Sequence, residues 1–487
     1  MPRSKRVLLG IAALLAGMLG ALAFSGALAA PRAAFLHIAT NLSGSPNRFS
    51  YYADIAVSPD GDRVVVAWSE AYQDGGGAMK GSVYLRWASE RTGGWSARVP
   101  VHTGTSSECA RWAAVAVTGT NPYTAVVAYI TQSPCDQFTS QAVRYRVCPL
   151  GGTCGPVQTV VYTTHLSGSQ SEPGYGAVDV ALDGAGQPHF AYTYYRRDLS
   201  QGKDVGTVYY RSPNIPAETV SENQNARLPA IAWNGGAVHV VWATEPTSED
   251  GYYSIFYRRR TTSGWAPSSR LLQQDLGYAP HSPAIAVFSS TVLVAWDMNN
   301  AWTDEGCSTA QEQCERYTLA YIRSTNNGDQ WPQDSTWGFR WYELGGGFQG
   351  TDRPYTSTGA VAEYIRFLRP SVGFRADGKP VVVWHANDGT TDNPDYNIYY
   401  TEALTVPENA EEAIEWGEIR RFGLNAPRHS ASPAVAPFLS GEALHVVYIQ
   451  GVPNASGQVT DWETYYDGNE DQKCSRVYLP VVLRNFR

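Results

Sequence analysis

Side chains that could hold a cation gather in two acidic loops towards the end of the chain. Asp467, Asn469 and Asp471 stand at alternate positions, the spacing at which calcium loops present oxygen ligands. The second loop contains Asp388, Asp392, Asn393 and Asp395. Neither contains a complete EF-hand pattern, so solvated acidic loops are the simpler interpretation. We expect that no cofactor is required, and calcium is the ion that the spacing of these loops would allow.

Three histidines, His189, His239 and His445, each lie three residues before an aromatic residue. They occupy the same position in different units of a repeat described below. Equivalent positions of different units are far apart around a ring, so we do not expect a shared metal. We interpret them as features of the repeat.

The seven cysteines indicate disulfides in an oxidising compartment. No C-x-x-C pair occurs, so the spacing does not indicate a zinc site. Local geometry predicts three pairs, which leave Cys474 over: Cys109–Cys135, Cys148–Cys154 and Cys307–Cys314.

The first 29 residues have the layout of a secretory signal peptide. Arg3, Lys5 and Arg6 precede an apolar run from Val7 to about Leu22, and Ala27-Leu28-Ala29 offers small residues for cleavage. The alternative is an uncleaved N-terminal anchor. No later run reaches 18 apolar residues, so we expect no transmembrane span in the mature chain. The sequence therefore predicts a secreted or cell-surface protein.

The charge balance argues against a nucleic-acid partner. Lys and Arg number 37 and Asp and Glu number 45, which gives a net charge of −8. A sequence-independent nucleic-acid binder needs a basic face that displaces counterions. This chain offers none.

One pattern recurs seven times and predicts the elements that position these side chains. A small residue in a short apolar strand is followed, 10 to 13 residues later, by an aromatic residue that ends a β-branched strand. The small residues are Ala56, Ala116, Ala181, Ala232, Ala286, Gly373 and Ala436. The aromatic residues are Trp68, Tyr129, Tyr192, Trp242, Trp296, Trp384 and Tyr448. With a third and a fourth strand after most of them, these units predict an all-β, seven-bladed β-propeller of four-stranded antiparallel blades over residues 34–472.

Two features concern the ends of this ring. The seventh unit lacks a fourth strand, and we expect Phe35–Ala39 to complete it and so remove open sheet edges. Six blades are the second choice, because the interval from Ala286 to Gly373 is long. The C-terminal extension, residues 473–487, is either a sorting signal or a strand that packs on the propeller. We expect a monomer.

The segment Arg323–Trp331 resembles the Asp-box, S-x-D-x-G-x-x-W, of sialidases and related BNR-repeat propellers, with Asn326 in place of Asp. Arg227–Ala232, followed by Val238–Trp242, is similar to the sialidase-like repeat. The likeness covers most of residues 45–470 as a pattern. It implies a structural turn on the outer strands, away from a catalytic pocket. It says more about fold than function, because this propeller serves enzymes and binding proteins alike.

The resemblance also implies what a sialidase-like site would contain. Such a site needs three arginines that clamp a substrate carboxylate, a proton-transferring acid, and a Tyr–Glu nucleophile pair. The candidate arginines stand just before innermost strands: Arg111, Arg227 and Arg369. The candidate acids follow second strands at the same face: Glu70, Glu245 and Asp297. No Tyr can be paired with a Glu from the sequence.

Three functional hypotheses follow. The first is an extracellular or cell-surface binding module, with a glycan or protein ligand at the face bearing the loops Ala71–Met79, Asn299–Glu315 and Gly345–Ile365. The second is a sialidase-like glycoside hydrolase with an arginine-clamped acidic sugar. The third is a structural component of the cell envelope.

Overall fold

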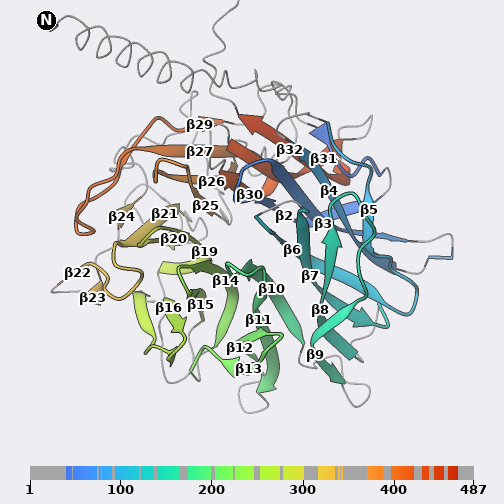
Figure 1. The fold of residues 1–487 in the computed structure, drawn as a ribbon, viewed down its shortest axis with the longest axis horizontal. Coiled ribbons are helices and arrows are strands. Elements are labelled where there is room, and N and C mark those ends of the chain that lie inside the picture. Colours follow the sequence, from blue (N-terminus) through green and yellow to red (C-terminus); the bar gives the residue numbers. More distant parts are fainter. Residues whose placement is uncertain are drawn as a thin grey trace, which may run out of the picture.

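The computed structural model forms seven blades of antiparallel strands arranged around a central axis (Figure 1). One parallel bridge, between Phe49 and Trp462, joins the first blade to the last. The structure describes residues 40–45, 48–73, 76–77, 79–89, 94–119, 122–135, 140–164, 174–198, 203–222, 225–245, 253–274, 278–300, 316–334, 338–339, 342–343, 370–387, 396–421, 430–437, 444–453 and 459–469. Every regular element in these residues is a β-strand. The predicted seven-bladed propeller is therefore confirmed, and the six-bladed alternative is wrong.

The first four blades each begin at the axis and proceed outwards in chain order. Blade one contains β2 (Phe49–Val57), β3 (Arg63–Gln73), β4 (Met79–Ser89) and β5 (Val99–His102). Blade two contains β6 (Cys109–Val117), β7 (Thr124–Ser133), β8 (Ser140–Pro149) and β9 (Gln158–Thr164). Blade three contains β10 (Tyr175–Leu182), β11 (Pro188–Asp198), β12 (Lys203–Ser212) and β13 (Ile215–Thr219). Blade four contains β14 (Ala226–Asn234), β15 (Ala237–Thr244), β16 (Tyr253–Thr261), β17 (Gly264–Trp265) and β18 (Ser269–Gln274).

The last three blades follow the same order. Blade five contains β19 (Tyr278–Phe288), β20 (Thr291–Asn300), β21 (Arg316–Ser324) and β24 (Tyr342–Glu343), with a small hairpin of β22 (Gln333–Asp334) and β23 (Gly338–Phe339). Blade six contains β25 (Ser371–Phe374), β26 (Pro380–Asn387), β27 (Tyr396–Thr405), β28 (Glu415–Trp416) and β29 (Arg420–Arg421). Blade seven contains β30 (Ser430–Pro437), β31 (Leu444–Pro453) and β32 (Val459–Asn469).

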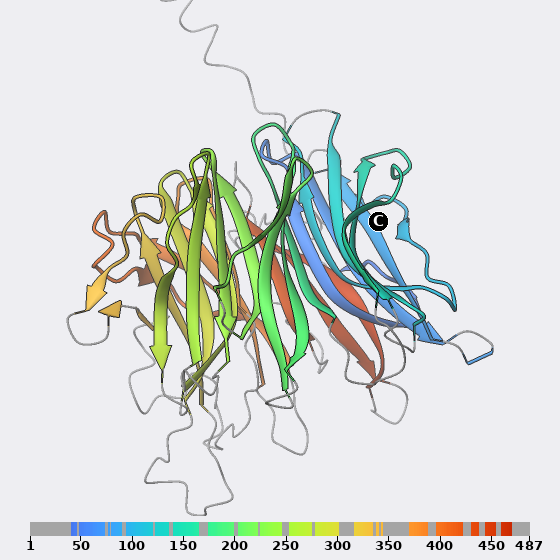
Figure 2. The ribbon, with the colours of Figure 1, turned by 90° about the horizontal axis from the view of Figure 1, so that it is seen from below.

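The repeated small and aromatic residues lie where the sequence predicts them. All seven small residues are on innermost strands, and all seven aromatic residues are on second strands, each at most 3% exposed. Viewed from the side, the strands of the blades run between two faces of the ring (Figure 2). We call the face at which innermost strands begin and second strands end the leading face.

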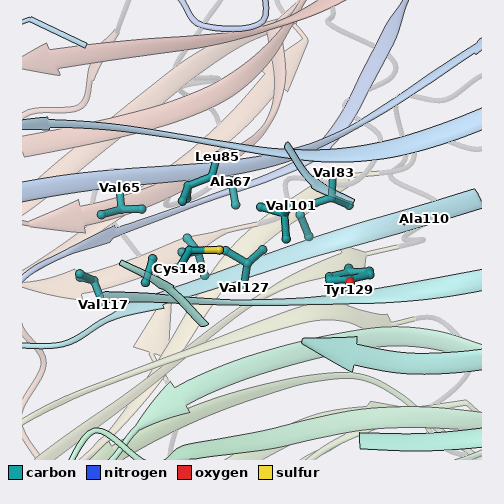
Figure 3. Packing of buried hydrophobic residues seen from close by; sticks show 13 residues of the cluster. Val65, Ala67, Val83, Leu85, Val101, Ala110, Val117, Val127, Tyr129 and Cys148 are labelled. Atoms are coloured by element: carbon teal, nitrogen blue, oxygen red, sulfur yellow. The ribbon is translucent and has the colours of Figure 1, made fainter. Parts of the chain in front are cut away.

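Apolar side chains from neighbouring blades fill the space between the sheets. Between blades one and two, Val65 and Leu85 pack with Val127, Tyr129 and other residues in one buried cluster (Figure 3). Similar clusters join the other pairs of adjacent blades. Burial of this apolar area, at about 25 cal/mol per Å², is the main force that holds the ring together.

A short N-terminal strand lies at the outer edge of blade seven. Residues of β1 (Thr40–Asn41) pair antiparallel with Tyr466 and Tyr465 of β32. Phe35–Ala39, the segment predicted to complete blade seven, lies outside the described residues. The outermost position of that blade is therefore occupied by the two residues that directly follow it.

A repeated arginine contact gives independent evidence for this placement. On third strands, Arg146 and Arg258 donate to the carbonyls of Val101 (2.8 Å) and Val220 (3.1 Å), at the outermost strand of the preceding blade. Arg86 of blade one donates in the same way to Leu42 (2.9 Å), directly after β1. In this contact, β1 takes the place of a fourth strand in blade seven.

Two predicted disulfides are formed, Cys109–Cys135 and Cys148–Cys154. The first ties the start of β6 to the residues after β7 at the leading face. Cys307, Cys314 and Cys474 lie outside the described residues, as do residues 1–29 and 473–487. Within the described ranges, no helix is long and apolar enough to cross a membrane.

Candidate functional site

The innermost strands share one irregularity near the leading face. In six blades the pairing of the innermost strand with the second strand shifts by one residue, so an extra residue is inserted. Such a β-bulge leaves that residue outside the ladder and changes the direction of its side chain. The shift follows Tyr51, Arg111, Tyr175, Arg227, His281 and Ala431.

Four of these bulges place a residue other than glycine in the left-handed region. Their φ angles are 52° for Tyr52, 61° for Trp112, 49° for Leu228 and 35° for Ser282. Large side chains rarely adopt this conformation, because Cβ approaches the following carbonyl. The bulge of blade three differs from these four, because its extra residue, Gly176, is not left-handed. A Cβ at Gly176 would lie 2.1 Å from the Tyr195 ring, so there is no room for a side chain there.

Two of the left-handed residues meet across the boundary between blades one and two. The rings of Tyr52 and Trp112 stack with centroids 4.0 Å apart, and Tyr51 packs edge-on against Tyr52 at 5.2 Å. All three are half-buried, as is the neighbouring Arg111. Burial raises the pKa of Tyr51 to about 12, although the positive charge of Arg111 opposes the rise. The Tyr51 hydroxyl therefore stays protonated at physiological pH.

The candidate arginines are in different surroundings. Arg227 forms an ion pair with Glu245, another candidate residue, and Asn225 also donates to this carboxylate (3.3 Å). Arg111 forms no ion pair with any described residue. Arg369 lies outside the described residues, so convergence of the three is not tested.

Glu70 is fully buried at the junction of blades one and seven. Its carboxylate accepts hydrogen bonds from the Trp68 indole (2.9 Å) and the Ser45 hydroxyl (3.1 Å). It also pairs with Arg48 (3.2 Å) and Arg98 (3.1 Å). A buried carboxylate with so many donors anchors the N-terminal residues to blade one. Asp297, the third candidate acid, is also fully buried, on β20.

Sequence reasoning missed two carboxyl groups that join adjacent blades at the axis. Asp54 accepts hydrogen bonds from the amides of Ile55 (2.9 Å) and Val115 (2.8 Å). Asp179 accepts in the same way from Val180 (2.8 Å) and, in the next blade, Ile231 (2.8 Å). Innermost strands have one unpaired edge, and these carboxyls satisfy amides there.

Burial raises the pKa of both carboxyls. The pKa of Asp54 rises to about 7, mainly through burial and also through the charge of Asp179, and that of Asp179 rises to about 6 through burial. Both stand two residues before the repeated small residue, where blades two, four, five and seven have Ala. That contrast within the repeat was a signal that could have revealed them.

The three repeat histidines form identical pairs, each inside one blade. The rings of His189, His239 and His445 lie 2.7 Å from the hydroxyls of Tyr210, Tyr257 and Tyr466. Burial lowers the pKa of His239 to about 4. These histidines are separate structural features on the strands and do not meet at one point.

The candidate cation loops are only partly described. Asp467 is buried on β32, whereas Asp471 and residues 388–395 lie outside the described ranges. Among the residues that the structure covers, no group of three His, Cys, Asp or Glu side chains could hold a metal ion.

The segment that resembles an Asp-box forms a turn after β21, the third strand of blade five. The Asn326 side-chain oxygen accepts from the Ser324 hydroxyl (2.8 Å) and the Gln330 amide (2.9 Å). Trp331 is buried and packs edge-on against Tyr257 of blade four at 4.8 Å. The turn is structural, as its resemblance implies, and lies on the outer part of the ring.

Comparisons with known proteins find likeness in structure only. No protein-family model and no curated protein matches the sequence. The NanB sialidase from Streptococcus pneumoniae is similar over 89% of this chain and 70% of its own, with 9% identity and a TM-score of 0.43. The GH93 α-L-arabinofuranosidase of Fusarium graminearum is similar over 89% of this chain and 97% of its own, with 9% identity and a TM-score of 0.43.

A third similar structure is not a glycosidase. The β-propeller domain of the Trilobed protease from Pyrococcus furiosus is similar over 87% of this chain and 95% of its own, with 10% identity and a TM-score of 0.43. A sialidase is thus among the structures to which this chain is similar. At such identities the likeness concerns the fold alone, and the fold rests on the strand pairing described above.

Proposed function

We propose that the protein is an exported propeller that binds a glycan or protein ligand at the leading face. The observation that carries the proposal is the set of bulges on six innermost strands, which place irregular backbone around the axis at one face. Bulges of this kind are common beside binding and active sites, where they redirect side chains. The loops expected at this face lie largely outside the described residues.

The state of two of the three candidate acids, Glu70 and Glu245, favours binding over glycoside hydrolysis. A general acid must reach the substrate oxygen that it protonates. Glu70 is enclosed by Trp68 and two arginines, and Glu245 is engaged by Arg227. Neither carboxylate is free to exchange a proton with a ligand without breaking these contacts.

Binding and hydrolysis can be separated with one protein preparation. The mature chain is applied to glycan and protein arrays, and in parallel to chromogenic glycosides, including a sialoside, with and without calcium. We expect saturable binding that Arg111→Ala weakens, without turnover. Turnover that disappears in Arg227→Ala would instead establish the hydrolase. Absence of both binding and turnover would favour the structural envelope component.

A further inference from the structure

We propose that Tyr52 and Trp112 form a platform on which one face of an uncharged sugar ring lies. This inference rests on the proposed binding function and specifies its ligand. The two rings belong to different blades, stack at 4.0 Å with 28° between their planes, and are partly exposed at the leading face. Because each ring covers one face of the other, the aromatic surface left for a ligand is the outer side of this stacked pair, which two adjacent innermost strands supply.

The bulge that recurs in the innermost strands holds both aromatic residues of the platform in a conformation that favours glycine. Both residues adopt the left-handed conformation, with φ of 52° and 61°. That conformation costs on the order of 1–3 kcal/mol for a bulky residue, and glycine would avoid the cost.

Hydrogen-bond donors surround the aromatic surface. No described residue forms a hydrogen bond with the Tyr51 or Tyr52 hydroxyl, the Trp112 indole N–H or the Arg111 guanidinium. None of these polar atoms is among the atoms buried without a partner, so all of them reach solvent. A sugar has apolar C–H faces and a rim of hydroxyls, and this combination of ring faces and free donors suits both parts.

The overall charge of the protein disfavours a polyanionic ligand. The protein carries a net charge of −8, which repels polyanionic glycans. Arg227 already has Glu245 as its partner. Arg111 is then the one candidate arginine, among those described, whose charge is not neutralised, and a single guanidinium can donate to ring hydroxyls as well as to an acid.

The test uses an array with two arms, one of neutral gluco-, manno-, xylo-, arabino- and galacto-oligosaccharides and one of sialylated and uronic-acid oligosaccharides. Affinity for the best neutral oligosaccharide is then measured for Tyr52→Gly, Trp112→Gly and Trp112→Phe. Tyr162→Ala, at an exposed aromatic on the outer strand β9, is the matched control.

We expect each glycine variant to raise Kd by about tenfold or more, which corresponds to about 1.4 kcal/mol, whereas Trp112→Phe and Tyr162→Ala stay near wild type. Melting temperature is measured alongside. If a glycine variant unfolds, hydroxyl-radical footprinting of the wild-type protein replaces it, and the oligosaccharide should protect Tyr52 and Trp112.

The outcomes separate this inference from the broader proposal. Neutral binding that survives both glycine variants, or that leaves Tyr52 and Trp112 unprotected, would overturn the platform and leave the binding function standing. Binding restricted to the acidic arm would overturn the choice of an uncharged ligand. A wild-type protein that binds nothing on either arm, and nothing on the protein array, would overturn the proposed function itself.

Discussion

At the scale of single residues, Asp54 and Asp179 link the ionisation of the protein to its blade contacts. Each carboxyl accepts one amide from its own strand and one from the next blade. Ser371 makes the equivalent contact between blades six and seven, to the Val435 amide at 3.1 Å. Because Ser371 does not ionise near neutral pH, only the two aspartates make this inter-blade contact sensitive to pH.

We expect the free energy of unfolding to fall as pH rises from about 4 to about 8. The pKa values of Asp54 and Asp179 are raised from 3.8 to about 7 and about 6, so the folded state binds these protons more tightly than the unfolded chain. Their contribution to stability is complete below the unfolded value and is lost as pH passes the folded values. One pKa unit corresponds to about 1.4 kcal/mol, so even half of the Asp54 shift contributes about 2 kcal/mol.

Denaturant titrations at several pH values test this. Asp54→Asn should reduce the fall in the free energy of unfolding between about pH 4 and about pH 8, because the amide does not ionise. This holds whatever the effect of the substitution on absolute stability. The exposed Asp377→Asn provides the control and should leave the decline unchanged. An undiminished slope in Asp54→Asn would show that other groups dominate.

At the scale of elements, the turn after β21 depends on one side-chain oxygen. Asn326 accepts two hydrogen bonds within the turn, and the turn positions Trp331 against blade four. Gly328 is the residue that the turn requires, because its φ is 77° and a Cβ would collide with Tyr257. The Asn at this position does the same work as the Asp of the motif that it resembles, since either supplies an acceptor oxygen.

Removing this oxygen should lower the free energy of unfolding, whereas replacing the amide by a carboxylate should not. Asn326→Ala loses two hydrogen bonds and should lower the free energy of unfolding by about 1–3 kcal/mol. Asn326→Asp keeps the acceptor and adds charge, so it should be neutral or stabilising. Chemical denaturation of both variants measures this, and an aspartate variant as unstable as the alanine variant would refute the assigned role.

At the scale of the whole molecule, the N-terminal residues join the last blade to the first. Leu42 is 1% exposed within the cluster between blades one and seven, and its backbone bonds to Thr464 of β32 (2.8 Å) and to Arg86. The outer edge of β32 would be open to other chains without this segment, and open edges promote association. We therefore expect the pairing of the N-terminal residues with blade seven to protect the protein against aggregation as well as to stabilise it.

Leu42→Ala should destabilise the protein by about 2–5 kcal/mol and also promote self-association. Leu271→Ala is the matched control, because Leu271 is equally buried but lies in the cluster between blades four and five. Leu271→Ala should lower the free energy of unfolding by a similar amount but should not promote self-association. Denaturation and light scattering at several protein concentrations measure both effects, and equal association of the two variants would count against a special role of the seam.

The sequence predicted the number of blades and the strands that carry the small and aromatic residues. It could do so because the two residues of each unit are only 10 to 13 positions apart. The sequence also predicted the two described disulfides and the turn that resembles an Asp-box. It identified the three histidines as features of the repeat. These depend on local spacing and on contacts within a hairpin. Glu70 shows the limit, because the sequence placed it after a second strand, whereas it lies within β3 and pairs there with two arginines.

Only the tertiary structure decided how the blades meet. The contacts of Asp54 and Asp179 with the next blade span 61 and 52 residues, and the bulges that turn Tyr52 and Trp112 towards each other depend on strand register. Register and inter-blade packing are set by the sum of many distant contacts, so no short stretch of sequence encodes them. The repeat thus determined the ring, and packing between its blades determined the arrangement of side chains at the leading face.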